Sequence, residues 1–157
     1  MPPGVQYCGA SREVLLGLIY CYVNDFDYAV HVEQGSLLKG ERFIERIIEA
    51  NPDADLIVPS GERTPQPTGY GFFIVSRRGI PGFIKSYTDF PQTDAKLSVE
   101  RKLLAVTETM PSAVINLKYG RQRPIDFQTS HFFVKHMVLR ELEAFCEVVG
   151  YDLTTQR

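Results

Sequence analysis

Hydrophobic and polar positions at the start of the chain predict a helix followed by a strand. Ser11 is a suitable helix N-cap and Glu13 falls in the first turn, so we expect a helix over residues 11–24. The apolar run at its end suits a strand equally well, and the choice stays open for residues 14–23. Residues 28–32 alternate between apolar and polar, which indicates a short strand.

The next segment, SLLKGERFIERIIEANP, carries the clearest helical pattern of the first half. Four apolar residues share one face of the expected helix, and acidic residues occupy another face: Phe43, Ile44, Ile47 and Ile48 against Glu41, Glu45 and Glu49. Asn51-Pro52 ends the helix. A brief strand over 56–59 and a proline-containing loop over 60–69 follow.

The stretch TGYGFFIVSRRGIPGFIKSY predicts a central hairpin with strands at about 70–77 and 82–88. A turn at Arg78-Gly79, or a longer one over Arg78–Pro81, places apolar residues on both faces, as a strand between two layers requires. Thr93 or Asp94 is expected to cap a helix over 95–109, and residues 113–119 and 124–129 read as a second hairpin around GRQR. Ser130 is expected to begin a last helix that ends at Gly150.

These elements together predict an α+β fold, because strands joined as adjacent hairpins form an antiparallel sheet that helices must cover. The chain has 157 residues, 44% of them apolar and 23% charged, which is ordinary for one domain with one core. We therefore expect a single α+β domain over 1–157 with a flexible start over 1–10.

Charge and targeting signals restrict the kind of protein only broadly. The net charge of −2 argues against binding nucleic acid along the whole surface, although residues 69–157 are basic and residues 1–68 are acidic. The apolar run over 14–23 is too short to span a bilayer and makes a poor signal peptide. Cys8, Cys21 and Cys146 lack paired spacing, so we expect reduced thiols in a cytoplasmic protein.

Catalytic motifs are weak or missing from the sequence. It contains no nucleophile elbow and no glycine-rich phosphate loop, and His131 and His136 would lie about 140° apart on one helix, so no cofactor or metal is expected. Asp53 and Asp55 begin like the acids of a metal-dependent nuclease, but the only Glu-x-Lys, at Glu100–Lys102, falls within a helix. A nuclease is therefore the third alternative.

Basic and aromatic residues of the two expected hairpins are the candidate binding surface. The residues assigned to it are Arg77, Arg78, Lys85, Tyr87, Lys118, Arg121 and Arg123. Such a surface suits an acidic protein partner or single-stranded RNA. Gly69-Tyr70-Gly71-Phe72-Phe73 also resembles the core of the RNP1 motif of RNA-recognition domains, a resemblance that implies base stacking by alternate aromatics.

The expected final helix carries two apolar stripes, and one sheet covers only one of them. We therefore assign the second stripe, Phe132, Leu139 and Cys146, to a dimer interface. The function we predict is a non-catalytic interaction or regulatory protein, a homodimer that binds a protein partner. The alternative is a single-stranded RNA-binding module that uses the aromatic and basic hairpins.

Overall fold

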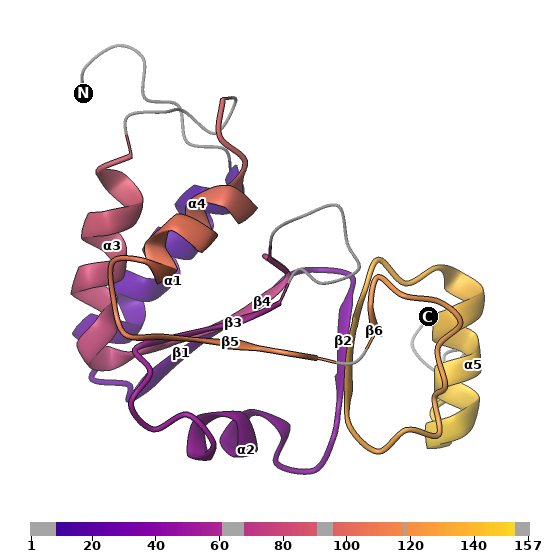
Figure 1. Cartoon of the computed structure of the whole chain (residues 1–157). Helices are drawn as coiled ribbons and strands as arrows, with labels where there is room; N and C mark the ends of the chain where they lie inside the picture. The colour runs from indigo at the N-terminus through magenta and orange to yellow at the C-terminus, as the bar shows by residue number, and fades with distance from the viewer. Residues whose placement is uncertain (1–8, 61–67, 91–95, 118, 153–157) are drawn as a thin grey trace.

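The computed structural model describes residues 9–60, 68–90, 96–117 and 119–152, and shows two sheets with helices packed against them (Figure 1). The first half of the chain contains α1 (Gly9–Val23), β1 (Tyr28–Val32), β2 (Ser36–Lys39), α2 (Phe43–Glu49), β3 (Leu56–Pro59) and β4 (Phe72–Ser76). The second half contains the short 3-10 helix η1 (Arg77–Gly79), α3 (Ile80–Thr88), α4 (Val99–Thr107), β5 (Ser112–Ile115), β6 (Tyr119–Gly120), β7 (Phe132–Lys135) and α5 (Leu139–Val149).

The larger sheet has the strand order β1-β4-β3-β5. Its first three strands are antiparallel neighbours, and β5 lies parallel to β3. The helices α1, α3 and α4 lie on one face of this sheet, and α2 lies on the other (Figure 1). The chain therefore has the expected α+β fold, with one parallel pair in the sheet.

The core under the three helices is built on a row of stacked aromatic rings. The ring of Phe73 lies 5.8 Å from that of Phe83, which lies 5.6 Å from that of Tyr87. All three side chains are buried, and the Tyr87 hydroxyl is 2.8 Å from Ser11 Oγ on α1. Because buried aromatics of this size contribute much of the hydrophobic free energy of a small domain, this row fixes α3 against the sheet.

The smaller sheet has the order β2-β7-β6, with β2 antiparallel and β6 parallel to β7. Phe133 of β7 and Phe72 of β4 belong to one apolar cluster, which α2 also joins through its apolar face. On the opposite side, Phe132 contacts the rings of Phe127 and Phe145, and the latter lies on α5. The smaller sheet is thus held against the larger one by apolar packing as well as by the chain segments that connect them.

Residues 70–88 form a strand and a helix, so the predicted hairpin is wrong. Ile80, Phe83, Ile84 and Tyr87 recur at helical spacing, and three of them are buried against the core. Ser76 begins the turn, because its hydroxyl accepts a hydrogen bond from Gly79 N at 3.2 Å. Proline in the first turn then favours a helix over a strand.

The expected long helices at 36–52 and 130–150 are each a strand followed by a shorter helix. Residues of β2 pair with residues of β7, Leu38 opposite Phe133, so two segments far apart in the chain stabilise each other as strands. The αL conformation of His136, with φ of +57°, ends β7 before α5 begins. Gly150 caps α5 in the αL conformation, as predicted.

The second predicted hairpin is also wrong, because residues 124–129 form turns and not a strand, and the strands within 112–120 divide between the two sheets, β5 in the larger and β6 in the smaller. Three other expectations are confirmed: strands at 28–32 and 56–59, and a helix over most of 11–24. Ser11 lies inside α1 and not at its cap, and the N-cap of α4 is Ser98, whereas Thr93 and Asp94 lie outside the described residues. Most of the 60–69 loop and residues 1–8 also lie outside them.

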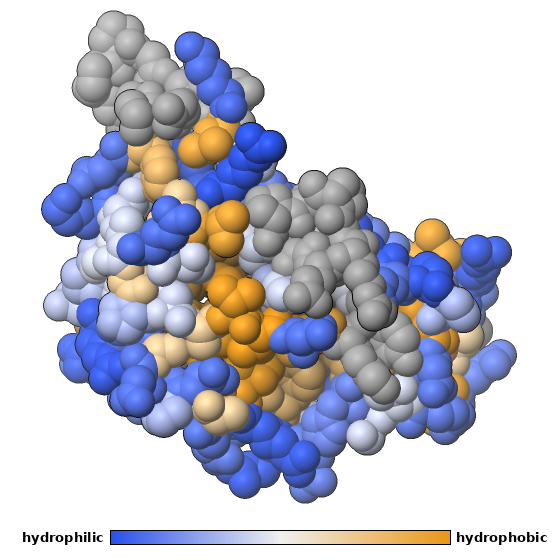
Figure 2. All heavy atoms as spheres, viewed as in Figure 1, coloured by the Kyte–Doolittle hydropathy of each residue, from blue (hydrophilic) through white to orange (hydrophobic). Residues whose placement is uncertain are grey.

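No helix in the described part of the chain is both long and apolar enough to cross a membrane. In the space-filling view, apolar side chains gather below the helical layer, over the strands of the larger sheet, and charged side chains surround them (Figure 2). Val114 of β5, 57% exposed, is one of the apolar residues that the larger sheet presents to solvent.

Candidate anion-binding pocket

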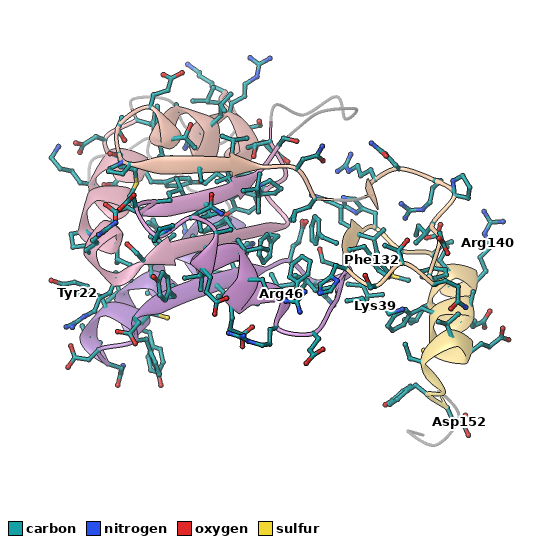
Figure 3. The ribbon with its side chains drawn as sticks, turned by 60° about the horizontal axis from the view of Figure 1, so that its bottom comes forward. Tyr22, Lys39, Arg46, Phe132, Arg140 and Asp152 are labelled. Carbon is teal, nitrogen blue, oxygen red and sulfur yellow. The ribbon has the colours of Figure 1, made fainter. Side chains whose placement is uncertain are left out.

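The predicted basic residues divide into two groups at opposite ends of β4. Arg77 and Arg78 follow the last residue of the strand, and Arg77 lies over the ring of Tyr22 on α1. Gly71, just before the strand, faces Lys135 of β7, whose neighbour His136 contacts Arg121. At about 3.3 Å per residue, roughly 16 Å of strand separates the two groups. Figure 3 likewise shows Tyr22 and Arg140 of α5 at opposite ends of the molecule.

Arg77 and Arg78 form ion pairs with acidic residues of their own chain. Arg77 pairs with Asp25, and Arg78 pairs with Asp55 and donates to the carbonyl oxygen of Asp53. Burial acts to raise the pKa of Asp55, but hydrogen bonds from Arg78 and Ser76 outweigh it and leave that pKa below its ordinary value. These arginines join η1 to the segments beside it.

Two further residues of the predicted surface, Tyr87 and Lys85, do not contribute to a common site. The Tyr87 side chain is fully buried, so it cannot contact a partner. Lys85 is exposed on α3, where it pairs with Asp89 at 2.5 Å in the i, i+4 arrangement. Lys118 lies outside the described residues.

Arg121 and Arg123 do come together, with two residues that the sequence interpretation missed. Lys135 and His136 complete the lining of an open pocket of about 390 Å³. Lys135 is the last residue of β7. His136 follows it with a positive φ, so its side chain does not continue the alternation of the strand. Arg121 and Arg123 are on the segment that follows β6, which pairs with β7 and so keeps the four residues adjacent.

Two of the three cations in this pocket are already balanced by carboxylates. Arg123 forms a two-pronged ion pair with Glu141 of α5 and also donates to the carbonyl oxygens of Lys135 and His136. Lys135 Nζ lies 3.2 Å from Glu33 Oε2. The remaining cation, Arg121, makes no ion pair with any described carboxylate, so the pocket carries a net charge of about +1 at neutral pH.

His136 determines how Arg121 is held. Arg121 Nη2 is 2.8 Å from His136 Nε2, and an arginine can only donate, so this histidine nitrogen is the acceptor. Burial, with Arg121 and Lys135 nearby, lowers the pKa of His136, which keeps the ring neutral at pH 7. The Nε atom of Arg121 is buried and has no hydrogen-bond partner among the described residues. The guanidinium of Arg121 is therefore held through Nη2 by His136, while its Nε has no described hydrogen-bond partner.

The surface expected to form a dimer through the last helix is not present. Phe132 lies in β7 and is buried, Cys146 is buried on α5, and Leu139 is 68% exposed at the first turn of α5. The three residues share no continuous face, because a strand and a turn replace the first part of the expected helix. The aromatics of the RNP1-like segment, Tyr70, Phe72 and Phe73, are also buried and offer no face for base stacking.

The acids considered for a nuclease have other contacts. Asp55 is paired with Arg78, and Lys102 is buried in α4 with its Nζ over the ring of Tyr87, 5.6 Å from the ring centre. Among the residues that the structure describes, no three histidines, cysteines or acids are grouped so that they could hold a metal ion.

Comparison with protein-family models, with curated proteins and with solved structures finds no match to this chain.

Proposed function

We propose that this is a non-catalytic binding protein whose basic pocket receives a carboxylate from an acidic segment of a protein partner. The observation that carries the proposal is the state of Arg121. Its guanidinium is positioned by His136, has a buried donor without a described partner, and is not neutralised by a described carboxylate. A carboxylate accepts the paired donors of an arginine in a fixed geometry, which makes it a fitting ligand.

The charge of the pocket favours a single carboxylate over a nucleic-acid backbone. Glu33 and Glu141 balance Lys135 and Arg123, which leaves about one positive charge for a ligand. Binding of nucleic acid depends on neutralising several phosphates at once, and Arg77 and Arg78 lie too far away to extend the row. The buried aromatics remove the stacking contribution that single-stranded RNA uses.

The experiment compares two anionic probes, a fluorescein-labelled deca-glutamate peptide and a labelled ten-nucleotide oligouridine. The variant Arg121→Ser removes the unbalanced guanidinium, and Arg140→Ser removes an exposed arginine of α5 as a control with the same change in net charge. We expect the peptide to bind the wild type and to bind Arg121→Ser about tenfold more weakly, since a charge-assisted hydrogen bond contributes about 1.5–3 kcal/mol. Binding to Arg140→Ser should stay close to wild type.

Three outcomes contradict the proposal. Equal weakening in both variants means that the peptide responds to overall charge and not to the pocket. Tighter binding of the oligouridine, again lost in Arg121→Ser, assigns the pocket to RNA. Absence of peptide binding even at low salt, where electrostatic attraction is strongest, also rejects it.

A further inference from the structure

The strand β1 is an edge strand of the larger sheet and has one free side. Asp27 O accepts from Arg77 N at 2.8 Å, and Glu33 N donates to Gly71 O at 2.9 Å, so the odd-numbered residues of this segment direct their backbone groups toward β4. Because N–H and C=O directions alternate along an antiparallel strand, Tyr28, Val30 and Val32 direct theirs to the free side. These groups have no backbone partner among the described residues.

This free edge lacks the features that usually protect one. The strand YAVHV contains no lysine, no proline and no acidic residue. Its side chains on the α2 face, Tyr28, Val30 and Val32, are exposed, because α2 packs against β3 and β4 and does not reach β1. An apolar edge strand with unpaired backbone groups is a template for another strand.

The helix beside this edge, α1, also carries exposed apolar residues. Leu16, Ile19, Tyr20 and Val23 of α1 lie at i, i+3, i+4 and i+7, and all are exposed. Between α1 and β1 lies a pocket of about 120 Å³, lined by residues that include Glu13, Gly17, Ala29 and His31. A Cβ at Gly17 would meet no atom within 4 Å, so the helix is open at this point to the approach of another element.

The sequence of β1 is complementary to itself in the antiparallel direction. A two-fold axis at Val30 places Val30 opposite Val30 and Tyr28 opposite Val32, an aromatic against a β-branched residue, which is a favourable cross-strand pair. On the helix face His31 comes opposite the small Ala29. This register uses every outward-directed residue of the strand and adds about six backbone hydrogen bonds.

We propose that two copies of this chain pair through antiparallel β1 strands about an axis at Val30, joining two four-stranded sheets into one. A second copy fits better than an unrelated extended peptide, because β1 is complementary to itself and because the copy brings a second α1 to the side of α1 that Gly17 leaves open next to β1. Five paired residues from each side cover only a few hundred Å², whereas a stable interface buries roughly 1,200 Å² or more. The helices must therefore take part. The inference uses no residue of the basic pocket and does not depend on the function proposed for it.

Variants of Val30 test the arrangement by sedimentation, with circular dichroism to monitor folding. Val30→Pro removes a backbone N–H that β1 does not use toward β4, and Val30→Lys places a charge on the axis. We expect a wild-type dimer at micromolar concentration and folded monomers for both variants. Val114→Lys, at the opposite edge of the sheet, is the matched control and should stay dimeric.

A cross-linking experiment tests the register itself. Directly opposed residues that exchange hydrogen bonds have Cα atoms about 5.5 Å apart, within the range of a disulfide. Val30→Cys should therefore form a covalent dimer on mild oxidation, seen on a non-reducing gel. Tyr28→Cys should not cross-link alone, but should do so when mixed with Val32→Cys.

Several results overturn the proposal. A wild type that stays monomeric up to 100 μM contradicts it, and so does a Val30→Lys variant that stays dimeric. Dissociation of the dimer by Val114→Lys but not by Val30→Lys would place the interface at the other edge of the sheet. Cross-linking of Tyr28→Cys as readily as Val30→Cys would contradict the register. If Val30→Pro is unfolded, Val30→Lys decides, since its side chain is already exposed and the charge does not enter the core.

Discussion

Lys135 Nζ on β7 lies 3.2 Å from Glu33 Oε2, in the connection between β1 and β2, and this ion pair lies where the two sheets meet. The two partners differ in burial, with the Lys135 side chain 5% exposed and that of Glu33 38% exposed. Gly71, just before β4, lies against both, since a Cβ there would be 2.9 Å from Glu33 Oε2 and 3.2 Å from Lys135 Nζ. The pair therefore connects the smaller sheet to two strands of the larger one.

Removing either partner of this pair should have unequal effects on stability. Glu33→Gln leaves a buried ammonium without its carboxylate and should lower the free energy of unfolding by about 2–4 kcal/mol. Lys135→Met leaves Glu33 Oε2 buried without its cation, but the Glu33 side chain is 38% exposed and can turn its carboxylate toward water, so the cost should be only about 1–2 kcal/mol. Urea denaturation of both variants and of the double variant measures the difference. The double variant should lose less than the sum, and equal single effects would contradict the asymmetry.

Two glycines at the start of α3 should respond in opposite directions to alanine. A Cβ at Gly79 would lie 2.8 Å from the carbonyl oxygen and from Cβ of Asp55, so Gly79→Ala forces backbone apart and should cost about 1–3 kcal/mol. A Cβ at Gly82 meets nothing within 4 Å, and Gly82→Ala should stabilise the helix by about 0.5–1 kcal/mol. Thermal unfolding of both variants is the measurement, and a destabilised Gly82→Ala would contradict an exposed position of Gly82 on α3.

The α3 helix also shows why part of the fold could be predicted from sequence and part could not. Ile80, Phe83, Ile84 and Tyr87 have helical spacing, and Pro81 suits a first turn, so local information was sufficient. The prediction of a hairpin is wrong because it relies on Arg78-Gly79 as a turn signal more than on this helical spacing. By contrast, β2 is a strand because Leu38 pairs with Phe133 far along the chain, and no local pattern reports that partner.

The same distinction holds for the pocket. Residue type and loop context in the sequence indicate Arg121 and Arg123, and the structure places them together. The helix that the sequence predicts over 130–150 would not bring Lys135 and His136 to these arginines. The run Phe132, Phe133 and Val134, rich in aromatic and β-branched residues, was the available signal for a strand.

Two residues of the discarded dimer surface should differ sharply when replaced by glutamate. Leu139 is exposed at the start of α5, where a carboxylate near the helix N-terminus is favourable, so Leu139→Glu should change stability by less than about 0.5 kcal/mol. Cys146 is buried on the same helix, and Cys146→Glu should destabilise the protein by several kcal/mol. Urea denaturation compares the two variants. If Leu139→Glu were unfolded, Leu139 would be a buried residue, which would favour the continuous helix that the sequence predicts over 130–150.

The last prediction concerns pH and His31, which lies on β1 with its ring 4.6 Å from that of Phe73 and 5.3 Å from that of Tyr70. Burial lowers the pKa of His31 below its ordinary 6.5, although Glu33 and Glu13 act in the opposite direction and Lys135 in the same one. The buried Nε2 atom has no hydrogen-bond partner among the described residues, so protonation there has no described acceptor.

The sign follows from comparing proton binding in the two states. Between the folded pKa and 6.5 the unfolded chain binds a proton at His31 that the folded chain does not, so stability is complete above about pH 7 and falls as the pH decreases. His136, whose pKa is also lowered, acts in the same direction. His31→Leu keeps an apolar contact with Phe73 and removes the titration. We therefore expect the loss of melting temperature between pH 7.5 and pH 5.5 to be smaller in His31→Leu than in the wild type, and His136→Gln to reduce it separately. An unchanged difference in His31→Leu would mean that burial does not lower the pKa of His31 in the folded protein, and would contradict the position of this ring against Phe73 and Tyr70.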